Sequence, residues 1–139
     1  MFKKLTICCL ALNFPMVVSA ATEFSCLHTC PPFVEGEFCE TTFEKLDDRF
    51  FTFTDDVVKA VGQLQDGRFV HFIWEILKES KDRLILVTDV DTDDVLGAQI
   101  AAFHLGTKNF TMGAIGVVLS EGAKSEGYKV AGKCTITQQ

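Results

Sequence analysis

The sequence is poor in proline, with three in 139 residues, and it has no low-complexity segment. It is 47% hydrophobic and 23% charged, a composition that argues against intrinsic disorder. A chain of this length has room for one hydrophobic core. We therefore expect a single globular domain.

Catalytic motifs are absent as well. The chain contains no Gly-x-Ser-x-Gly, His-Glu-x-x-His or glycine-rich phosphate-binding motif, and only three histidines, His28, His71 and His104. His71 and His104 lie among apolar neighbours, where an imidazole usually packs against the core or an edge. We expect a non-catalytic protein without a cofactor.

Basic residues are fewer than acidic ones. The sequence has 13 lysines and arginines against 19 aspartates and glutamates, and the basic residues form no cluster. Binding to nucleic acids or anionic membranes requires such clusters to neutralise phosphates. These partners are therefore disfavoured, and any partner guided by charge should be basic, such as a basic protein.

The first twenty residues differ from the rest. Lys3 and Lys4 precede the apolar run 5–18, and Val18-Ser19-Ala20 follows, as is typical of a secretory signal peptide. The run is shorter than the ~20 residues that a membrane span needs. We predict a signal peptide at 1–20 and an exported domain at 21–139, periplasmic or secreted, with no membrane span. Loss of the two lysines lowers the net charge from −6 to about −8.

The mature chain would keep four cysteines, Cys26, Cys30, Cys39 and Cys134. In a small exported domain, such cysteines usually form disulfides. Four cysteines allow three connectivities, which the sequence does not distinguish. We favour Cys39 with Cys134, which would close a long loop, and a local Cys26–Cys30 bond.

The segment from Cys26 through His28 to Cys30 also suggests an alternative. Two thiols around an imidazole could bind a metal ion or form an exchangeable disulfide. Their three-residue spacing differs from the two-residue spacing of common zinc and redox motifs. Free thiols at Cys26 and Cys30 would support this alternative.

The remaining chain predicts short antiparallel strands. Alternating apolar residues separated by glycine, asparagine and aspartate are typical of hairpins. The expected strands cover 37–43, 50–54, 68–78, 83–88, 100–105, 110–119 and 128–137, with a loop at 120–127. The apolar residues of 68–78 also fit one face of a helix, and their Phe, Val, Ile and Trp content favours a strand that forms a hairpin with 83–88. A second hairpin joins 100–105 to 110–115. Thr54 could also cap one short helix that ends before Asp66.

These strands define an all-β fold, a disulfide-pinned antiparallel meander of about six to eight strands. Such a sheet must close as a small barrel or fold as a sandwich to bury one face. Thirteen phenylalanines supply bulk for the core. Both a filled barrel and a hollow, ligand-carrying barrel fit this sequence.

The leader, the early cysteine, the hairpin FHLGTKNFTM and the ending YKVAGKC together resemble small exported β-proteins of Gram-negative bacteria. The resemblance covers the leader and about the last 70 residues. It implies a periplasmic or secreted location and a disulfide from Cys134 to an early cysteine. It implies no activity, and Cys26 and Cys30 depart from its pattern.

The function that these observations favour is a binding or interaction module with an acidic surface. One specific form would be a periplasmic inhibitor of a basic hydrolase. Charge and architecture alone suggest this form, and salt-sensitive binding to basic proteins would test it.

Overall fold

The computed structural model describes residues 21–53, 62–120 and 122–138, and its regular elements there are all strands. The strands are β1 (Thr22–Thr29), β2 (Phe38–Leu46), β3 (Arg49–Phe53), β4 (Gly62–Gln63), β5 (Phe69–Glu79), β6 (Arg83–Asp91), β7 (Val95–His104), β8 (Asn109–Val118) and β9 (Lys124–Gln138). The predicted signal peptide at 1–20 lies outside the described residues.

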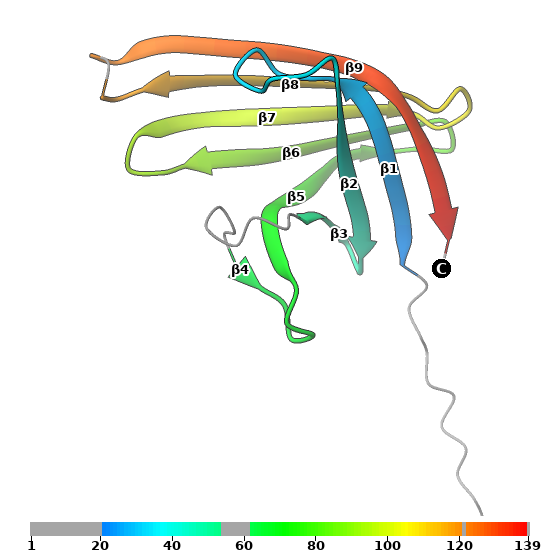
Figure 1. Cartoon of the computed structure of the whole chain (residues 1–139). Coiled ribbons are helices and arrows are strands. Elements are labelled where there is room, and N and C mark those ends of the chain that lie inside the picture. The colour runs from blue at the N-terminus through cyan, green and yellow to red at the C-terminus, as the bar shows by residue number, and fades with distance from the viewer. Residues whose placement is uncertain (1–20, 54–61, 121, 139) are drawn as a thin grey trace, which may run out of the picture.

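The strands form one closed antiparallel sheet (Figure 1). Neighbouring strands follow the chain, the last strand β9 pairs with β1, and β3 pairs with β5. Eight strands thus close an up-and-down barrel, while the short β4 extends the edge of β5. The predicted all-β meander and both predicted hairpins are confirmed, and the closure is that of a barrel rather than a sandwich.

The disulfides differ from the favoured pairing. Cys26 is bonded to Cys134, its direct partner across β1 and β9, and Cys30 is bonded to Cys39. The segment 22–29, for which the sequence pattern predicts no element, is a strand. A four-residue step along a strand spans roughly 13 Å, beyond the reach of a disulfide, so a Cys26–Cys30 bond is excluded.

The predicted helix and the predicted loop at 120–127 differ from the structure or lie partly outside it. The predicted helix falls mainly on residues 54–61, which lie outside the described residues, and its last part forms β4 instead. The predicted loop at 120–127 is wrong in its second half, because β9 already begins at Lys124 and pairs there with Val118.

Aromatic rings fill one end of the barrel. Phe43 is fully buried, and its ring centroid lies 5.2–5.6 Å from those of Trp74, Phe103 and Phe110. Phe24 extends the cluster through contact with Phe103. Tilted and edge-to-face rings at these distances pack densely and add to the free energy gained from burial.

Two buried threonines complete the hydrogen bonding of β5. A bulge interrupts its pairing with β3, and there the Phe72 amide donates to Thr52 Oγ1. On the other side, the Thr88 hydroxyl donates to the Ile73 carbonyl. The side chains thus satisfy backbone groups that would otherwise be buried without partners.

The barrel closes where β1 and β9 cross closely at Gly132. A Cβ atom at this position would clash with the Leu27 carbonyl oxygen and lie 2.6 Å from the Cα of His28. Only glycine therefore fits, because the contacting atoms belong to backbone that cannot move aside.

We predict that Gly132→Ala destabilises the protein by about 3 kcal/mol, as overpacking does at a rigid contact. Gly113→Ala is the matched control, because a Cβ there meets no atom within 4 Å. Urea unfolding followed by tryptophan fluorescence measures both variants. Equal stability of the two variants would contradict this account.

The two disulfides should contribute unequally to stability. Cys26–Cys134 spans 108 residues and Cys30–Cys39 spans 9. Chain entropy then predicts losses of about 4.7 and about 2.6 kcal/mol when each pair is replaced by alanine. Thermal unfolding of the two double variants tests this order, and a larger loss for Cys30/Cys39 would reverse it.

Candidate functional site

Interior side chains become smaller from one end of the barrel to the other. Along β7 the inward positions run from Phe103 to Gly97, and along β8 from Phe110 to Gly116. Gly97 and Gly116 face each other in the register, and a Cβ on Gly97 would lie 2.8 Å from the Cα of Gly116. The aromatic end is therefore filled, and the opposite end stays open.

The open end is flanked by an overhanging ribbon. Strand β9 pairs with β1 only from Gly132 onward, so its first residues run with β6, β7 and β8 beyond the end of β1 (Figure 1). The loop 30–37 between β1 and β2 faces this ribbon. The Cys30–Cys39 disulfide fastens the base of the loop.

Two adjoining cavities lie at this end. One has a volume of about 480 Å³ and reaches Phe72, Trp74 and Met112 inside the barrel. The other, of about 410 Å³, lies along the inner face of the ribbon over Gly97 and Gly116. Phe33, Gln99 and Tyr128 line both cavities and form their common wall.

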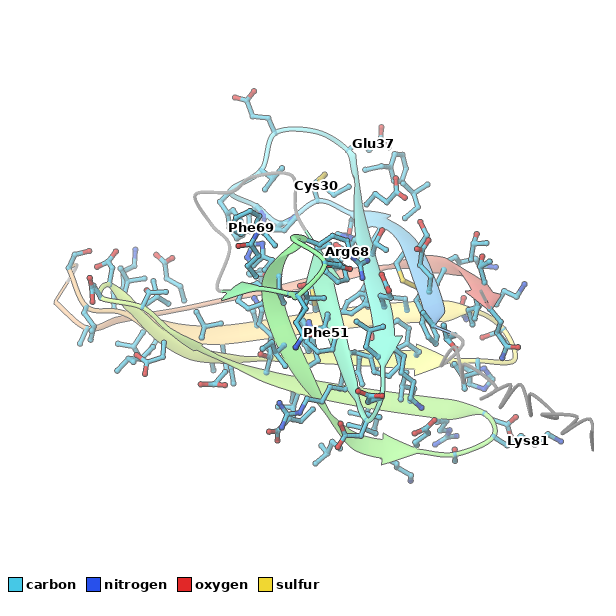
Figure 2. The ribbon with its side chains drawn as sticks, turned by 90° about the horizontal axis from the view of Figure 1, so that it is seen from below. Cys30, Glu37, Phe51, Arg68, Phe69 and Lys81 are labelled. Atoms are coloured by element: carbon cyan, nitrogen blue, oxygen red, sulfur yellow. A yellow bond between two sulfur atoms is a disulfide. The ribbon has the colours of Figure 1, made fainter. Side chains whose placement is uncertain are left out.

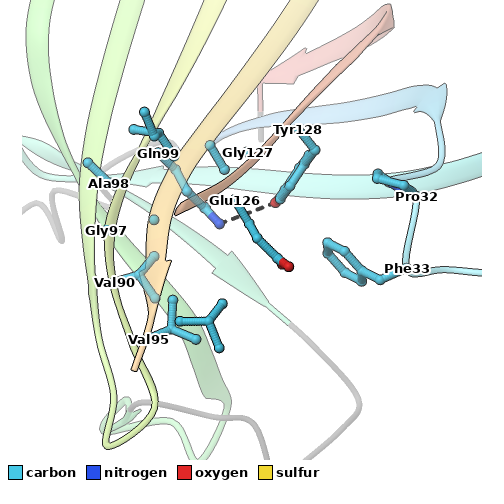
Figure 3. A pocket seen from close by; sticks show the side chains of 14 residues that line it. Pro32, Phe33, Val90, Val95, Gly97, Ala98, Gln99, Glu126, Gly127 and Tyr128 are labelled. Atoms are coloured by element: carbon cyan, nitrogen blue, oxygen red, sulfur yellow. Dashed lines mark hydrogen bonds between the residues drawn. The ribbon is translucent and has the colours of Figure 1, made fainter. Parts of the chain in front are cut away.

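The common wall is held by two contacts. The ring of Phe33, on the loop, meets the ring of Tyr128 edge-on at 5.3 Å between centroids. The Gln99 amide donates to the Tyr128 hydroxyl at 3.3 Å (Figure 3). Phe33 itself is 73% exposed, so this part of the loop covers the entrance to the cavities without being buried there.

Trp74 is a cavity-lining residue that carries an unpaired hydrogen-bond donor. It is 1% exposed and lines the larger cavity. Within the described residues, its indole Nε1 is the buried side-chain nitrogen or oxygen that lacks a hydrogen-bond partner. Burial of such a donor costs about 1–3 kcal/mol unless an acceptor reaches it.

The residues of the metal or thiol site that the sequence suggests, Cys26, His28 and Cys30, form disulfides and hydrogen bonds instead. Cys26 and Cys30 belong to two different disulfides, so neither offers a thiolate. The His28 Nδ1–H donates to the Thr29 carbonyl at 2.7 Å, which leaves Nε2 to accept from the Thr41 hydroxyl at 2.8 Å. This segment closes the barrel and lines the cavity with an imidazole that already has its partners.

The other two histidines lie apart. His104 is exposed at the turn between β7 and β8, where its Nδ1 accepts from the Thr107 amide. His71 packs on Phe72, at 4.0 Å between ring centroids, and lines the larger cavity. The structure brings no two of the three histidines together as a hydrogen-bonded pair within the described residues.

The sequence pattern does not single out the residues of the common wall, Phe33, Gln99 and Tyr128, nor Trp74. The signal in the sequence is the decrease in side-chain size at alternate positions, from Phe103 to Gly97 and from Phe110 to Gly116. It becomes informative only once the register of β7 and β8 is known.

A separate polar cluster on the outer surface is structural. Arg68 lies over the Phe53 ring and bonds Glu44 and Asp66, which attaches the segment 62–68 to the barrel (Figure 2). The Glu44 hydrogen bond is the main cause that raises the pKa of Arg68 above its usual value. The Arg68 backbone and side-chain hydrogen bonds lower the pKa of Asp66.

Comparison of the chain with protein-family models, curated proteins and solved structures finds no match.

The disulfides bear on the cellular environment. Two structural disulfides are typical of oxidising compartments and indicate a protein that resides outside the cytoplasm. The described residues contain no helix long and apolar enough to cross a membrane.

Tyr128 provides a direct test of the site's burial. It is the only tyrosine, and desolvation raises its pKa above 10.0. The unfolded chain then ionises first, so stability should fall as the pH rises above about 10, until the folded phenol ionises too. Ultraviolet absorbance of the phenolate measures the folded pKa, with the chain in guanidinium as control. Titration at or below the control would contradict the partial burial of Tyr128.

Proposed function

We propose that the protein is an exported, non-catalytic binding module that takes a small ligand with an apolar body into the open end of the barrel. The cavities there, of about 480 and 410 Å³, fall within the range of small-molecule sites. Their walls are mainly aromatic and aliphatic. The polar residues among the lining are His28, Glu40, Thr41, Thr52, His71, Gln99, Glu126 and Tyr128.

The buried indole N–H of Trp74 carries this proposal. Trp74 lines the larger cavity, and its N–H has no protein acceptor among the described residues, so a ligand whose oxygen or nitrogen reaches the N–H from this cavity would supply the missing acceptor. A purely structural core tends to avoid such a group. The ligand should therefore combine an apolar body with at least one hydrogen-bond acceptor.

The division of the interior supports the same function. The aromatic end provides the packing that a small barrel needs, so the open end is free to remain incompletely filled. The periplasm or the extracellular space is the proposed location, since both the four cysteines and the signal-like leader suit export.

The test uses the neutral fluorescent probe N-phenylnaphthylamine with the disulfide-intact protein. Trp74 is the only tryptophan, so energy transfer from it to the probe reports occupation of the cavity. We expect saturable binding in which probe emission rises as Trp74 emission falls.

Two variants on β7 locate the site. Gln99→Phe places a bulky ring in the wall shared by both cavities. It should weaken probe binding at least about tenfold, which corresponds to about 1.4 kcal/mol of binding free energy. Ile100→Phe adds the same ring on the outer face and should bind as the native protein does. Absence of saturable binding, or equal effects of the two variants, would refute the proposal.

A further inference from the structure

The charges that line the two cavities have one sign. Glu126 lines the smaller cavity, and no lysine or arginine appears among the described residues that line either. Glu40 lies at the rim of the larger cavity, where its carboxylate accepts a hydrogen bond from the Ser25 hydroxyl on the outer face of the barrel. The lining imidazoles are His28, which is held by Thr29 and Thr41, and His71, which packs on Phe72. A cavity mouth with a carboxylate, and with no cation among its described lining residues, is complementary to a positive ligand.

The surrounding loops extend this negative charge. Glu35 and Glu37 lie in the loop 30–37, and Asp93 and Asp94 lie at the tip of the overhanging ribbon. The turn 80–82 lies at the opposite end of the barrel, and Figure 2 shows its Lys81 far from Cys30 and Glu37. Arg68 and Lys124 also lie at this end, but each is paired with a carboxylate. The described residues of the open end are therefore negative on balance, which attracts cations and repels anions.

One corner of the mouth suits a cationic group. Glu126 and Tyr128 are two residues apart on β9 and so project from the same face, and Figure 3 shows the Glu126 side chain directed toward Phe33. The rings of Phe33 and Tyr128 lie 5.3 Å apart beside it. Aromatic rings next to a carboxylate are the arrangement that binds ammonium groups through cation–π and Coulomb attraction.

Within the described residues, Lys124 forms an ion pair with Glu126 at this corner. Its Nζ lies 3.6 Å from Glu126 Oε1, with both side chains more than half exposed. An exposed ion pair of this kind contributes little free energy. A ligand cation that also contacts the rings can therefore replace Lys124 beside Glu126.

We propose that the ligand is an organic cation, an ammonium group joined to an apolar body. The ammonium lies among Phe33, Tyr128 and Glu126, and the body extends along the cavity toward Trp74. This inference rests on the proposed function and adds the charge of the ligand to it.

Three probes with the same alkyl chain separate the two proposals. Octyltrimethylammonium, octyl glucoside and octyl sulfate, each kept below its micelle concentration, are titrated into the disulfide-intact protein by calorimetry and Trp74 fluorescence. We expect the ammonium probe to bind about tenfold more tightly than the glucoside, and the sulfate to bind most weakly. Added salt should weaken only the ammonium complex appreciably.

Variants that each remove one charged side chain test where the ligand's ammonium group binds. Glu126→Gln should weaken ammonium binding about fivefold and leave glucoside binding unchanged, whereas Lys124→Gln should strengthen ammonium binding about twofold. Glu75→Gln, which removes one carboxylate from the exposed outer face of β5, is the matched control and should change neither.

The outcomes are distinguishable. Similar affinities for all three probes would sustain the binding cavity and overturn the preference for a cation. Tighter binding of octyl sulfate than of octyltrimethylammonium would likewise sustain the binding cavity and overturn the preference for a cation. Failure of all three to bind would overturn the proposed function and this inference together.

Discussion

The contact between β1 and β9 is the constraint on which the rest of the structure depends. These strands lie at opposite ends of the chain, so their pairing carries the largest loss of chain entropy in the fold. Three features hold them together: the Cys26–Cys134 bond, the absence of a side chain at Gly132, and a continuous ladder from Thr22 to His28. Without this contact, the meander would remain an open sheet with two exposed edges.

Closure at this point also creates the site. Because β1 ends near Gly132 while β9 begins eight residues earlier, the ribbon of β6–β9 must overhang, and the loop 30–37 must turn back across it. The same strands carry large residues at the closed end and glycines at the open end. The dense aromatic packing and the two cavities thus lie at opposite ends of one barrel. Trp74, whose N–H is unpaired, contacts Phe43 in the aromatic cluster and also lines the larger cavity.

Periodicity in the sequence predicts the meander because a half-buried strand exposes alternate residues to water, as along Tyr128–Ile136. The N-terminal strand is harder to predict, since its inward residues are Phe24, Cys26 and His28, and the two cysteines suggest a local bond instead. Disulfide pairing follows strand register, which no local pattern encodes. The cavity depends on which glycines face each other across β7 and β8, so the candidate site is visible only after folding.

The central claim is that the open end binds a ligand next to Trp74. With a single tryptophan, the protein gives one indole N–H resonance in a two-dimensional NMR spectrum. On addition of octyltrimethylammonium, or of octyl glucoside if charge is irrelevant, the account predicts shifts of this resonance and of the amides of Gln99 and Tyr128, with Phe103 and Phe110 unchanged. If the chemical shift of the indole N–H does not change, or if only residues on the outer face of the barrel shift, the claim that the open end binds a ligand is contradicted.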